Sequence, residues 1–324
     1  MMKAVRVQTP GAADVMTVVD VETPTPGEGQ LLVDNKAIGL NYIDVYHRSG
    51  AYPVDLPTGI GLEAGAVVEA VGPGVTDFAA GDRVAYCLGP LGAYAQKHVV
   101  NAKTIAKLPD AIAFETAAAM MLKGCTAEYL LKRTYPVKKG DWVLFHAAAG
   151  GVGLIAGQWL AHIGAHAIGT AGSAEKCALA KAHGYAHVIN YQSEDFVARV
   201  KEITGGAGVH VVYDGVGAST FDRSLDCLGK YGMMVSYGNA SGPVDALNTG
   251  LLAQKGSLYV TRPTLFTYYG DYDEAQQGYA ALFDVVSSGA VKINIEQRYP
   301  LADIVQAHKD LEGRKTVGST IILP

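Results

Sequence analysis

Residues 143–153, V-L-F-H-A-A-A-G-G-V-G, constrain the fold of this chain more than any other stretch. An apolar run of β type is followed by a cluster of tiny residues and then by an amphipathic run, in which apolar side chains recur at helical spacing at Val152, Ile155, Trp159 and Ile163. Small residues at a strand-to-helix turn let the backbone approach a pyrophosphate, and the N–H groups at the helix start stabilise its charge. The stretch therefore predicts a dinucleotide-binding turn.

The usual fingerprint of such a turn is G-x-G-x-x-G, and its three glycine positions fall here on Ala148, Gly150 and Gly153. The first glycine is thus an alanine. Glycines at a strand-to-helix turn can also serve backbone conformation alone. The buried-strand character of residues 143–145 favours the dinucleotide interpretation. His146 ends this strand, where a histidine is more often part of the core than a catalyst.

Downstream of residue 140 the sequence alternates between apolar β-type runs and helical stretches. Strands are expected at residues 143–146, 165–170, 187–190, 210–214, 233–237 and 257–260, and helices at 175–183, 196–203, 221–228 and 247–254. Six strands joined by helical crossovers predict an α/β fold with a doubly wound, parallel, six-stranded Rossmann sheet.

The first hundred residues have a different pattern, with frequent Gly and Pro between short β-branched runs such as residues 30–33 and 66–71. Many short strands joined by tight turns predict a small, partly open β-barrel. Residues 111–131 shift to helix formers, and the segment after Pro263 is too short to form a domain of its own. We therefore expect a first domain at 1–125, a nucleotide-binding domain at 126–264 inserted into it, a completing segment at 265–324, and a cleft between the two domains.

Composition limits the partners of the protein. Lys and Arg number 26 and Asp and Glu number 31, which gives a net charge of −5 and argues against nucleic-acid coating or an electrostatic membrane anchor. The cysteines are far apart in sequence and form no C-x-x-C pair, so neither a disulfide framework nor a zinc knuckle is indicated. No targeting segment and no run of about 18 apolar residues is present, so we expect a cytoplasmic protein without a membrane partner.

The end of the second expected strand, residues 171–173, indicates which dinucleotide is bound. An NAD site carries an acidic residue here, whereas this chain has Gly172 and Ser173, followed by Lys176 on the next helix. A hydroxyl, free N–H groups and a cation suit a 2′-phosphate, and Glu175 can project away from it, so the sequence favours NADPH. Alternatively, Lys176 is an ordinary solvated lysine. Tyr191 can cover the phosphate with its hydroxyl or simply pack.

The chain resembles the medium-chain dehydrogenase/reductase superfamily along its whole length. The resemblance is carried by N-Y-I-D at 41–44, G-I-G-L-E-A-G at 59–65, G-D-R-V at 81–84 and H-A-A-A-G-G-V-G at 146–153. It extends through G-S-A-E-K at 172–176, N-Y at 190–191, Y-D-G-V-G at 213–217 and G-S-L-Y-V-T-R-P at 256–263. Together these motifs are similar to the zinc-independent quinone oxidoreductases, the relatives of ζ-crystallin, in which a Rossmann domain is inserted into a GroES-like barrel domain.

Zinc-dependent members of the superfamily place a catalytic cysteine where this chain has Asn41, and a histidine where it has Leu62. Neither residue offers zinc the thiolate or imidazole ligand that it prefers. The cysteine-rich lobe that holds a structural zinc is missing as well. The resemblance therefore implies an enzyme without a metal site.

The resemblance implies a two-lobed, usually dimeric enzyme that passes a hydride from NADPH to a quinone, with the dimer formed edge to edge around Tyr259. The residues implied to contact the cofactor are Tyr42, Ile43, Asp44, Tyr46, Lys123, Thr126, Tyr129, Gly150, Gly151, Val152, Gly172, Ser173, Lys176, Tyr191, Asn239, Phe266 and Arg314.

Three residues implied to lie in the substrate stretch of the first lobe, Asn41, Tyr46 and Tyr52, can donate hydrogen bonds to the oxyanion that forms on a reduced quinone. None is a strong acid at neutral pH, so water can deliver the proton. The two tyrosines can instead be packing residues. Asp44 can act as a base, or it can pair with Arg48 if this stretch is helical.

Two other functions remain open. The same site can pass a hydride to the β-carbon of an enal or enone, as related double-bond reductases do. The chain can also be an NADPH-binding protein with a structural or regulatory role, because its cofactor-binding residues are clearer than any catalytic ones.

Overall fold

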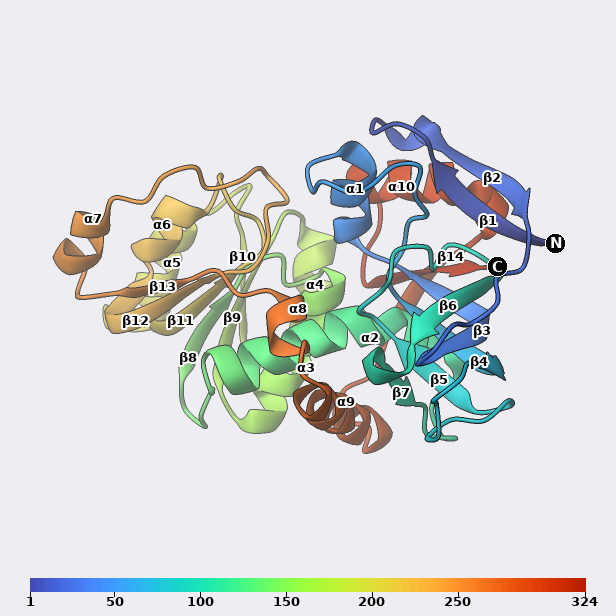
Figure 1. The fold of residues 1–324 in the computed structure, drawn as a ribbon. Coiled ribbons are helices and arrows are strands. Elements are labelled where there is room, and N and C mark those ends of the chain that lie inside the picture. The colour runs from blue at the N-terminus through green and yellow to red at the C-terminus, as the bar shows by residue number, and fades with distance from the viewer. The chain divides into compact units, whose positions relative to one another are not determined.

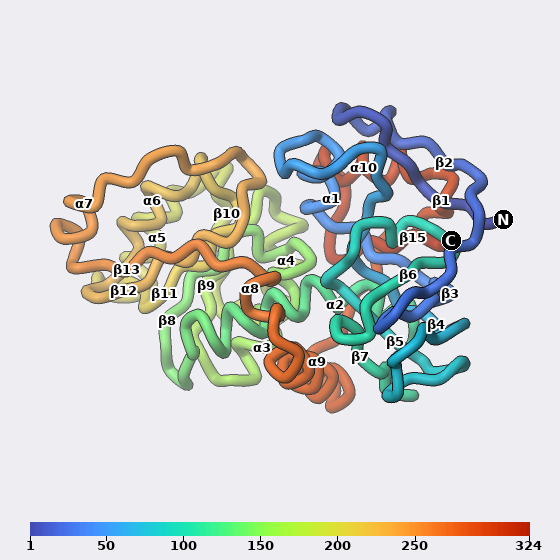
Figure 2. Tube along the Cα trace, in the orientation of Figure 1, coloured from blue at the N-terminus to red at the C-terminus, as the bar shows by residue number.

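A computed structural model describes residues 1–324, which form two compact units (Figure 1). Unit 1 comprises Met1–Cys125, Tyr269–Ser287 and Ile293–Pro324, and unit 2 comprises Thr126–Tyr268 and Ser288–Lys292. Both ends of the chain therefore belong to unit 1 (Figure 2).

Unit 2 is built on a six-stranded sheet in the order β10-β9-β8-β11-β12-β13, in which every pair of neighbours is parallel. The strands are β8 (Trp142–Phe145), β9 (His166–Ala171), β10 (His187–Asn190), β11 (Val209–Asp214), β12 (Leu228–Ser236) and β13 (Tyr259–Thr261). The helices are α3 (Gly151–Ile163), α4 (Ala174–Ala182), α5 (Phe196–Ile203), α6 (Phe221–Leu225), α7 (Thr249–Gln254) and α8 (Leu265–Tyr268). The predicted doubly wound sheet is thus confirmed.

Burial on both faces explains why these strands read as continuous apolar runs. Figure 1 shows α5 and α6 over one face of the sheet and α3 over the other. Phe196 of α5 and Phe221 of α6 join a buried cluster with Leu144 and Val212 of the central strands. Strand β12 begins five residues before the expected 233 because Leu228 already pairs with Val209 of β11, ahead of an irregularity after which Met233 pairs with Val211.

Unit 1 contains a seven-stranded sheet in the order β14-β15-β3-β4-β5-β7, with β6 also paired to β3, and a separate antiparallel β1-β2 pair. Its strands are β1 (Met2–Val7), β2 (Met16–Val21), β3 (Gln30–Leu40), β4 (Ala64–Val71), β5 (Arg83–Tyr86), β6 (Lys97–Asn101), β7 (Ile105–Lys107), β14 (Ile295–Pro300) and β15 (Ser319–Leu323). Its helices are α1 (Tyr42–Ser49), α9 (Tyr272–Ser287) and α10 (Ile304–Glu312). Helix α2 (Phe114–Tyr129) begins in unit 1 and ends in unit 2, where a π-helical segment (Leu130–Thr134) follows it.

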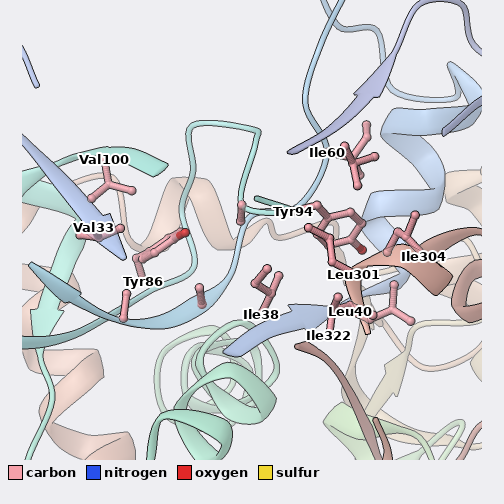
Figure 3. Close-up of a cluster of buried hydrophobic side chains, with 14 of the residues drawn as sticks. Val33, Ile38, Leu40, Ile60, Tyr86, Tyr94, Val100, Leu301, Ile304 and Ile322 are labelled. Atoms are coloured by element: carbon pink, nitrogen blue, oxygen red, sulfur yellow. The ribbon is translucent and has the colours of Figure 1, made fainter. Parts of the chain in front are cut away.

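The core of unit 1 joins residues from the beginning and the end of the chain (Figure 3). Ile38 and Leu40 of β3 pack with Ile304 of α10 and Ile322 of β15, and β15 pairs antiparallel with β3. Tyr94 lies in the same core with its hydroxyl hydrogen-bonded, which is how a buried tyrosine satisfies its polar end. The C-terminal segment therefore completes the sheet begun by the N-terminal one.

Helix α10 runs beside α1 (Figures 1 and 2), the helix that carries several of the predicted site residues. The four cysteines are free thiols, and all except Cys177 are buried. No helix is both long enough and apolar enough to span a membrane.

Candidate functional site

The predicted dinucleotide turn lies between β8 and α3 of unit 2. Ala147 adopts a left-handed backbone conformation with φ 54°, and Gly150 is the N-cap of α3. A Cβ atom at Gly153 would lie 2.5 Å from the carbonyl oxygen of Ala147, so only glycine allows the turn to close this tightly onto the helix. Gly151 and Val152 form the first turn of α3, where N–H groups have no helical partner.

The alanine at the first glycine position fits because a neighbouring strand makes room for it. A Cβ atom at Gly169 of β9 would lie 2.6 Å from the Cβ atom of Ala148. Because Gly169 has no side chain, the methyl group of Ala148 fits beside β9. A glycine on the adjacent strand thus allows an alanine at the first fingerprint position of the turn.

The predicted 2′-phosphate residues meet at the end of β9. Ser173 is the N-cap of α4, and its side chain accepts a hydrogen bond of 3.3 Å from the backbone N–H of Lys176. Tyr191 follows β10, and its hydroxyl oxygen lies 2.5 Å from where a Cβ atom of Gly172 would stand. The structure brings Gly172, Ser173, Lys176 and Tyr191 together, as a shared binding role requires.

Glu175 does not project away from this turn as expected. Its carboxylate accepts hydrogen bonds from its own backbone N–H and from the Ser173 side chain, and these hold the pKa of the exposed carboxyl below its usual range. The expectation from helix spacing was wrong because a glutamate in the first helical turn can fold back onto unpaired N–H groups. The carboxylate thus occupies donors that a phosphate would use.

Asn239 lies in a loop after β12 that is joined to the loop after β11. The Ser241 N–H donates to the carbonyl of Val216 at 2.7 Å, and the Ala218 N–H donates to the carbonyl of Gly242 at 3.1 Å. These contacts make the two loops one layer at the carboxyl ends of two neighbouring strands.

The remaining predicted residues of unit 2 lie around α2 and α8. Thr126 and Tyr129 are buried, and the Tyr129 ring stacks on Tyr268 with 4.7 Å between ring centroids and 12° between their planes. Burial raises the pKa of the Tyr129 hydroxyl, which is therefore neutral at physiological pH. Phe266 is 44% exposed, so its ring is available to a ligand.

In unit 1, helix α1 and the following loop gather three tyrosines. Tyr42 and Tyr46 meet edge to face with 5.4 Å between ring centroids, and Tyr46 and Tyr52 meet at 5.0 Å. The Tyr52 N–H donates to the Tyr46 carbonyl at 3.1 Å, which fixes the loop onto the helix. The rings are half-buried and form an aromatic surface of the kind that binds planar ligands.

Asn41 is the residue before α1, and its side chain is hydrogen-bonded to the buried carboxylate of Glu63. The Asn41 Nδ2 donates to Glu63 Oε2 at 2.7 Å, and the Leu122 N–H donates to Glu63 Oε1 at 2.7 Å. The Lys123 Nζ lies 3.7 Å from Glu63 Oε2 and donates to the Leu40 carbonyl at 3.1 Å. Sequence reasoning gave Glu63 no role, although a carboxylate in the otherwise apolar G-I-G-L-E-A-G stretch indicates a buried partner.

Asp44 points into the core of unit 1 rather than toward solvent. Its Oδ2 accepts the Asn41 N–H at 2.9 Å and the Tyr94 hydroxyl at 2.7 Å, while Oδ1 has no partner. Burial raises the pKa of this carboxyl to about 7. The alternative of a pair with Arg48 is not formed, because Arg48 makes two hydrogen bonds to Glu312 at 2.9 and 2.8 Å.

Two further predicted cofactor contacts lie on α1 and just after α10. Ile43 is half-buried on α1, and Arg314 is exposed just after α10, with a left-handed φ of 57°. Leu62, at the position of the zinc-binding histidine, is buried. No three His, Cys, Asp or Glu side chains are grouped so that they could hold a metal ion.

Comparison with known proteins decides the family. A quinone oxidoreductase from Pseudomonas aeruginosa is 49% identical over 325 residues, which cover 100% of both chains. This chain belongs to the quinone oxidoreductase family. The crystal structure of the Escherichia coli quinone oxidoreductase complexed with NADPH matches with a TM-score of 0.98 and 49% identity, covering 99% of this chain and 100% of that one.

Two domain models and a relative with another substrate complete the comparison. Residues 27–110 match the alcohol dehydrogenase GroES-like domain, and residues 151–290 match the zinc-binding dehydrogenase family. A 2-haloacrylate reductase from Burkholderia is 44% identical over 331 residues, covering 100% of this chain and 99% of that protein. The GroES-like and Rossmann architecture predicted from sequence is therefore confirmed.

Proposed function

We propose that this protein reduces quinones with NADPH and does so without zinc. The observation that carries the proposal is its similarity over the full length, at about half identity, to quinone oxidoreductases, one of which is structurally known with NADPH. We further propose that the two units are the substrate and nucleotide domains expected at 1–125 with 265–324 and at 126–264.

The turns of unit 2 fit the dinucleotide. The close turn at Gly153 and the helix start at Gly150 offer N–H groups to a pyrophosphate. Ser173, Lys176 and the Tyr191 hydroxyl surround the position of a 2′-phosphate. When bound, NADPH supplies the hydride.

The side chains of unit 1 fit the acceptor. The surface formed by Tyr42, Tyr46 and Tyr52 can stack against a quinone ring, and tyrosine hydroxyls can hydrogen-bond the quinone oxygen as charge develops on it. The Asn41 amide has two hydrogens, of which the bond to Glu63 uses one, so the other can serve the same oxygen. A water molecule supplies the proton.

The donor set around Asn41 favours chemistry without zinc. Its amide is engaged with Glu63, and the neighbouring Leu62 is a hydrocarbon. A quinone also needs no Lewis acid, because reduction gives an aromatic product whose developing charge is delocalised.

The test is steady-state oxidation of NADPH with 1,4-benzoquinone, followed by NADPH absorbance, on protein whose zinc content has been measured. We expect turnover without stoichiometric zinc, and a lower kcat/KM in Tyr46→Phe and Tyr52→Phe. In Lys176→Ala we expect the preference for NADPH over NADH to fall. Stoichiometric zinc, or a cofactor preference unchanged by Lys176→Ala, contradicts the corresponding part of the proposal.

Reduction of an activated carbon–carbon double bond is the second candidate, favoured by the similarity to 2-haloacrylate reductase. A comparison of kcat/KM for benzoquinone and an α,β-unsaturated ketone separates the two activities, and turnover of the ketone alone rejects quinone reduction. Tight NADPH binding without turnover of either substrate indicates a structural or regulatory protein instead.

A further inference from the structure

A buried chain of hydrogen bonds crosses the carboxyl ends of three parallel strands in unit 2. The Thr170 hydroxyl of β9 lies 2.9 Å from Nδ1 of His146, which follows β8. The Nε2 of His146 lies 2.9 Å from the Ser224 hydroxyl of α6, which in turn lies 3.2 Å from Oδ2 of Asp214, the last residue of β11. All four side chains are buried, with relative exposures of 1% or less.

The partners determine which nitrogen of His146 carries the proton. The Ser224 hydroxyl has one hydrogen, and its other partners, the Thr220 carbonyl at 2.8 Å and the Asp214 carboxylate, can only accept. His146 Nε2–H must therefore donate to Ser224. Burial lowers the pKa of His146 against the opposing effect of Asp214, so the ring is neutral and Nδ1 accepts from Thr170. The hydrogen bonds then run from Thr170 through His146 to Ser224, whose one hydrogen is shared between the Thr220 carbonyl and the Asp214 carboxylate.

This arrangement of serine, histidine and aspartate is not a nucleophilic triad. In a triad the histidine accepts the serine proton, whereas here Ser224 donates to acceptors other than His146. Ser224 has no exposed surface, so a substrate has no access to its hydroxyl.

Each end of the chain also holds a turn of the proposed cofactor site. At one end, the Thr170 carbonyl accepts the Ala148 N–H of the dinucleotide turn at 2.9 Å, and Thr170 precedes the 2′-phosphate turn by one residue. At the other end, Asp214 Oδ1 accepts the N–H groups of Val216 at 2.7 Å and Gly217 at 3.0 Å. These two residues belong to the loop that is joined to the Asn239 loop.

We infer that the Thr170–His146–Ser224–Asp214 chain positions the cofactor-binding turns of three strands as one unit. His146, Thr170, Ser224 and Asp214 are positioning residues, since none lies at the surface where a cofactor binds. The inference rests on the proposed function, because these hydrogen bonds position a cofactor site only if NADPH binds at these turns.

The experiment uses substitutions that change single hydroxyl groups. Thr170→Val removes the donor to His146 with little change in volume, whereas Thr170→Ser keeps it. Ser224→Ala breaks the chain at its next link. Thr204→Val is the matched control, because Thr204 is a nearly buried threonine of unit 2 whose hydroxyl bonds Val200 and Gly208 after α5, outside the chain.

The dissociation constant of NADPH, the kcat and KM for benzoquinone and the thermal midpoint are measured for each variant. We expect Thr170→Val and Ser224→Ala to raise the dissociation constant of NADPH about fivefold, which is the effect expected from the loss of one buried hydrogen bond. Thr170→Ser and Thr204→Val should stay within about twofold of the wild type. Nitrogen NMR of the wild type should show His146 protonated at Nε2, with the signal assigned by its absence from His146→Gln.

The results distinguish failure of the proposed function from failure of the inference. A wild type that does not bind NADPH overturns the proposed function, and the inference with it. Normal wild-type binding that Thr170→Val leaves unchanged, or that Thr204→Val weakens equally, overturns the inference alone. A His146 protonated at Nδ1 does the same.

Discussion

Asp44 provides a test of the buried polar structure of unit 1 through the substitution Asp44→Asn. Burial raises the pKa of its carboxyl from 3.8 to about 7. Each pKa unit corresponds to about 1.4 kcal/mol of preference for one protonation state, so ionising Asp44 in the folded protein costs about 4 kcal/mol. Asparagine is nearly isosteric and cannot ionise, so the variant should lack this pH-dependent cost.

The direction of the effect follows from proton binding. Between pH 4 and pH 7 the folded protein keeps the Asp44 proton while the unfolded chain has lost it. The stability contributed by Asp44 is therefore fully present below about pH 4 and is lost as the pH rises to about 7. The free energy of unfolding of the variant minus that of the wild type should increase by about 1.4 kcal/mol per pH unit over this range, and then level off.

Two buried histidines in the same unit change the stability with pH in the direction opposite to Asp44. Comparing the variant with the wild type removes their contribution. Burial lowers the pKa of His308 to about 3 and that of His98 to about 4, so both stabilise the fold at neutral pH and this contribution is lost as the pH falls below 6.5. Because the variant retains both, their contribution cancels in the difference.

The assay is urea unfolding at several pH values, followed by far-UV circular dichroism. Fluorescence of Trp142 and Trp159 alone is unsuitable because both lie in unit 2. The control is Asp284→Asn, the same change at an exposed position of unit 1, measured at the same pH values. A difference between Asp44→Asn and wild type that stays constant from pH 5 to pH 8 refutes the reasoning.

Three further predictions follow from the packing and charge of unit 2. Glu175→Gln should lower the KM for NADPH about threefold and leave that for NADH unchanged, because it frees the Ser173 side chain from a competing charge. Gly169→Ala should lower stability by about 1–3 kcal/mol in thermal unfolding, and adding Ala148→Gly should restore much of it, since the two Cβ atoms would collide. If the protein forms the edge-to-edge dimer that the family resemblance implies, Tyr259→Lys should make it a monomer in size-exclusion chromatography, because Tyr259 is 59% exposed on the edge strand β13; an unchanged elution volume rejects this dimer surface.

The sequence predicted best what depends on local pattern. Six apolar runs gave the six strands of unit 2, because a parallel strand covered on both faces must be apolar throughout. The residues at the end of β9 were singled out by their spacing to the glycine turn, and the structure brings them together, while their binding of a 2′-phosphate stays a prediction.

The sequence could not reveal contacts between distant positions. Arg48 and Glu312 are 264 residues apart, and Tyr94 and His308 are 214 apart, so no local pattern pairs them. The orientation of the Glu175 side chain was predicted wrongly for a different reason. Helix spacing determines the position of the backbone but not the direction that a flexible side chain takes. The chain through His146 was missed because its members come from four segments, each with a conventional apolar or polar pattern.

The pairing of β15 with β3 determines the order in which the two units can fold during synthesis. During synthesis, unit 2 has all its strands available once residue 261 has emerged, whereas β3 waits for Ser319–Leu323 to cover its edge. Until then the nascent chain exposes an unpaired apolar edge at Ile38 and Leu40, which is a template for pairing with other chains. Chaperone demand and aggregation during translation should therefore arise from unit 1, the part translated first and finished last.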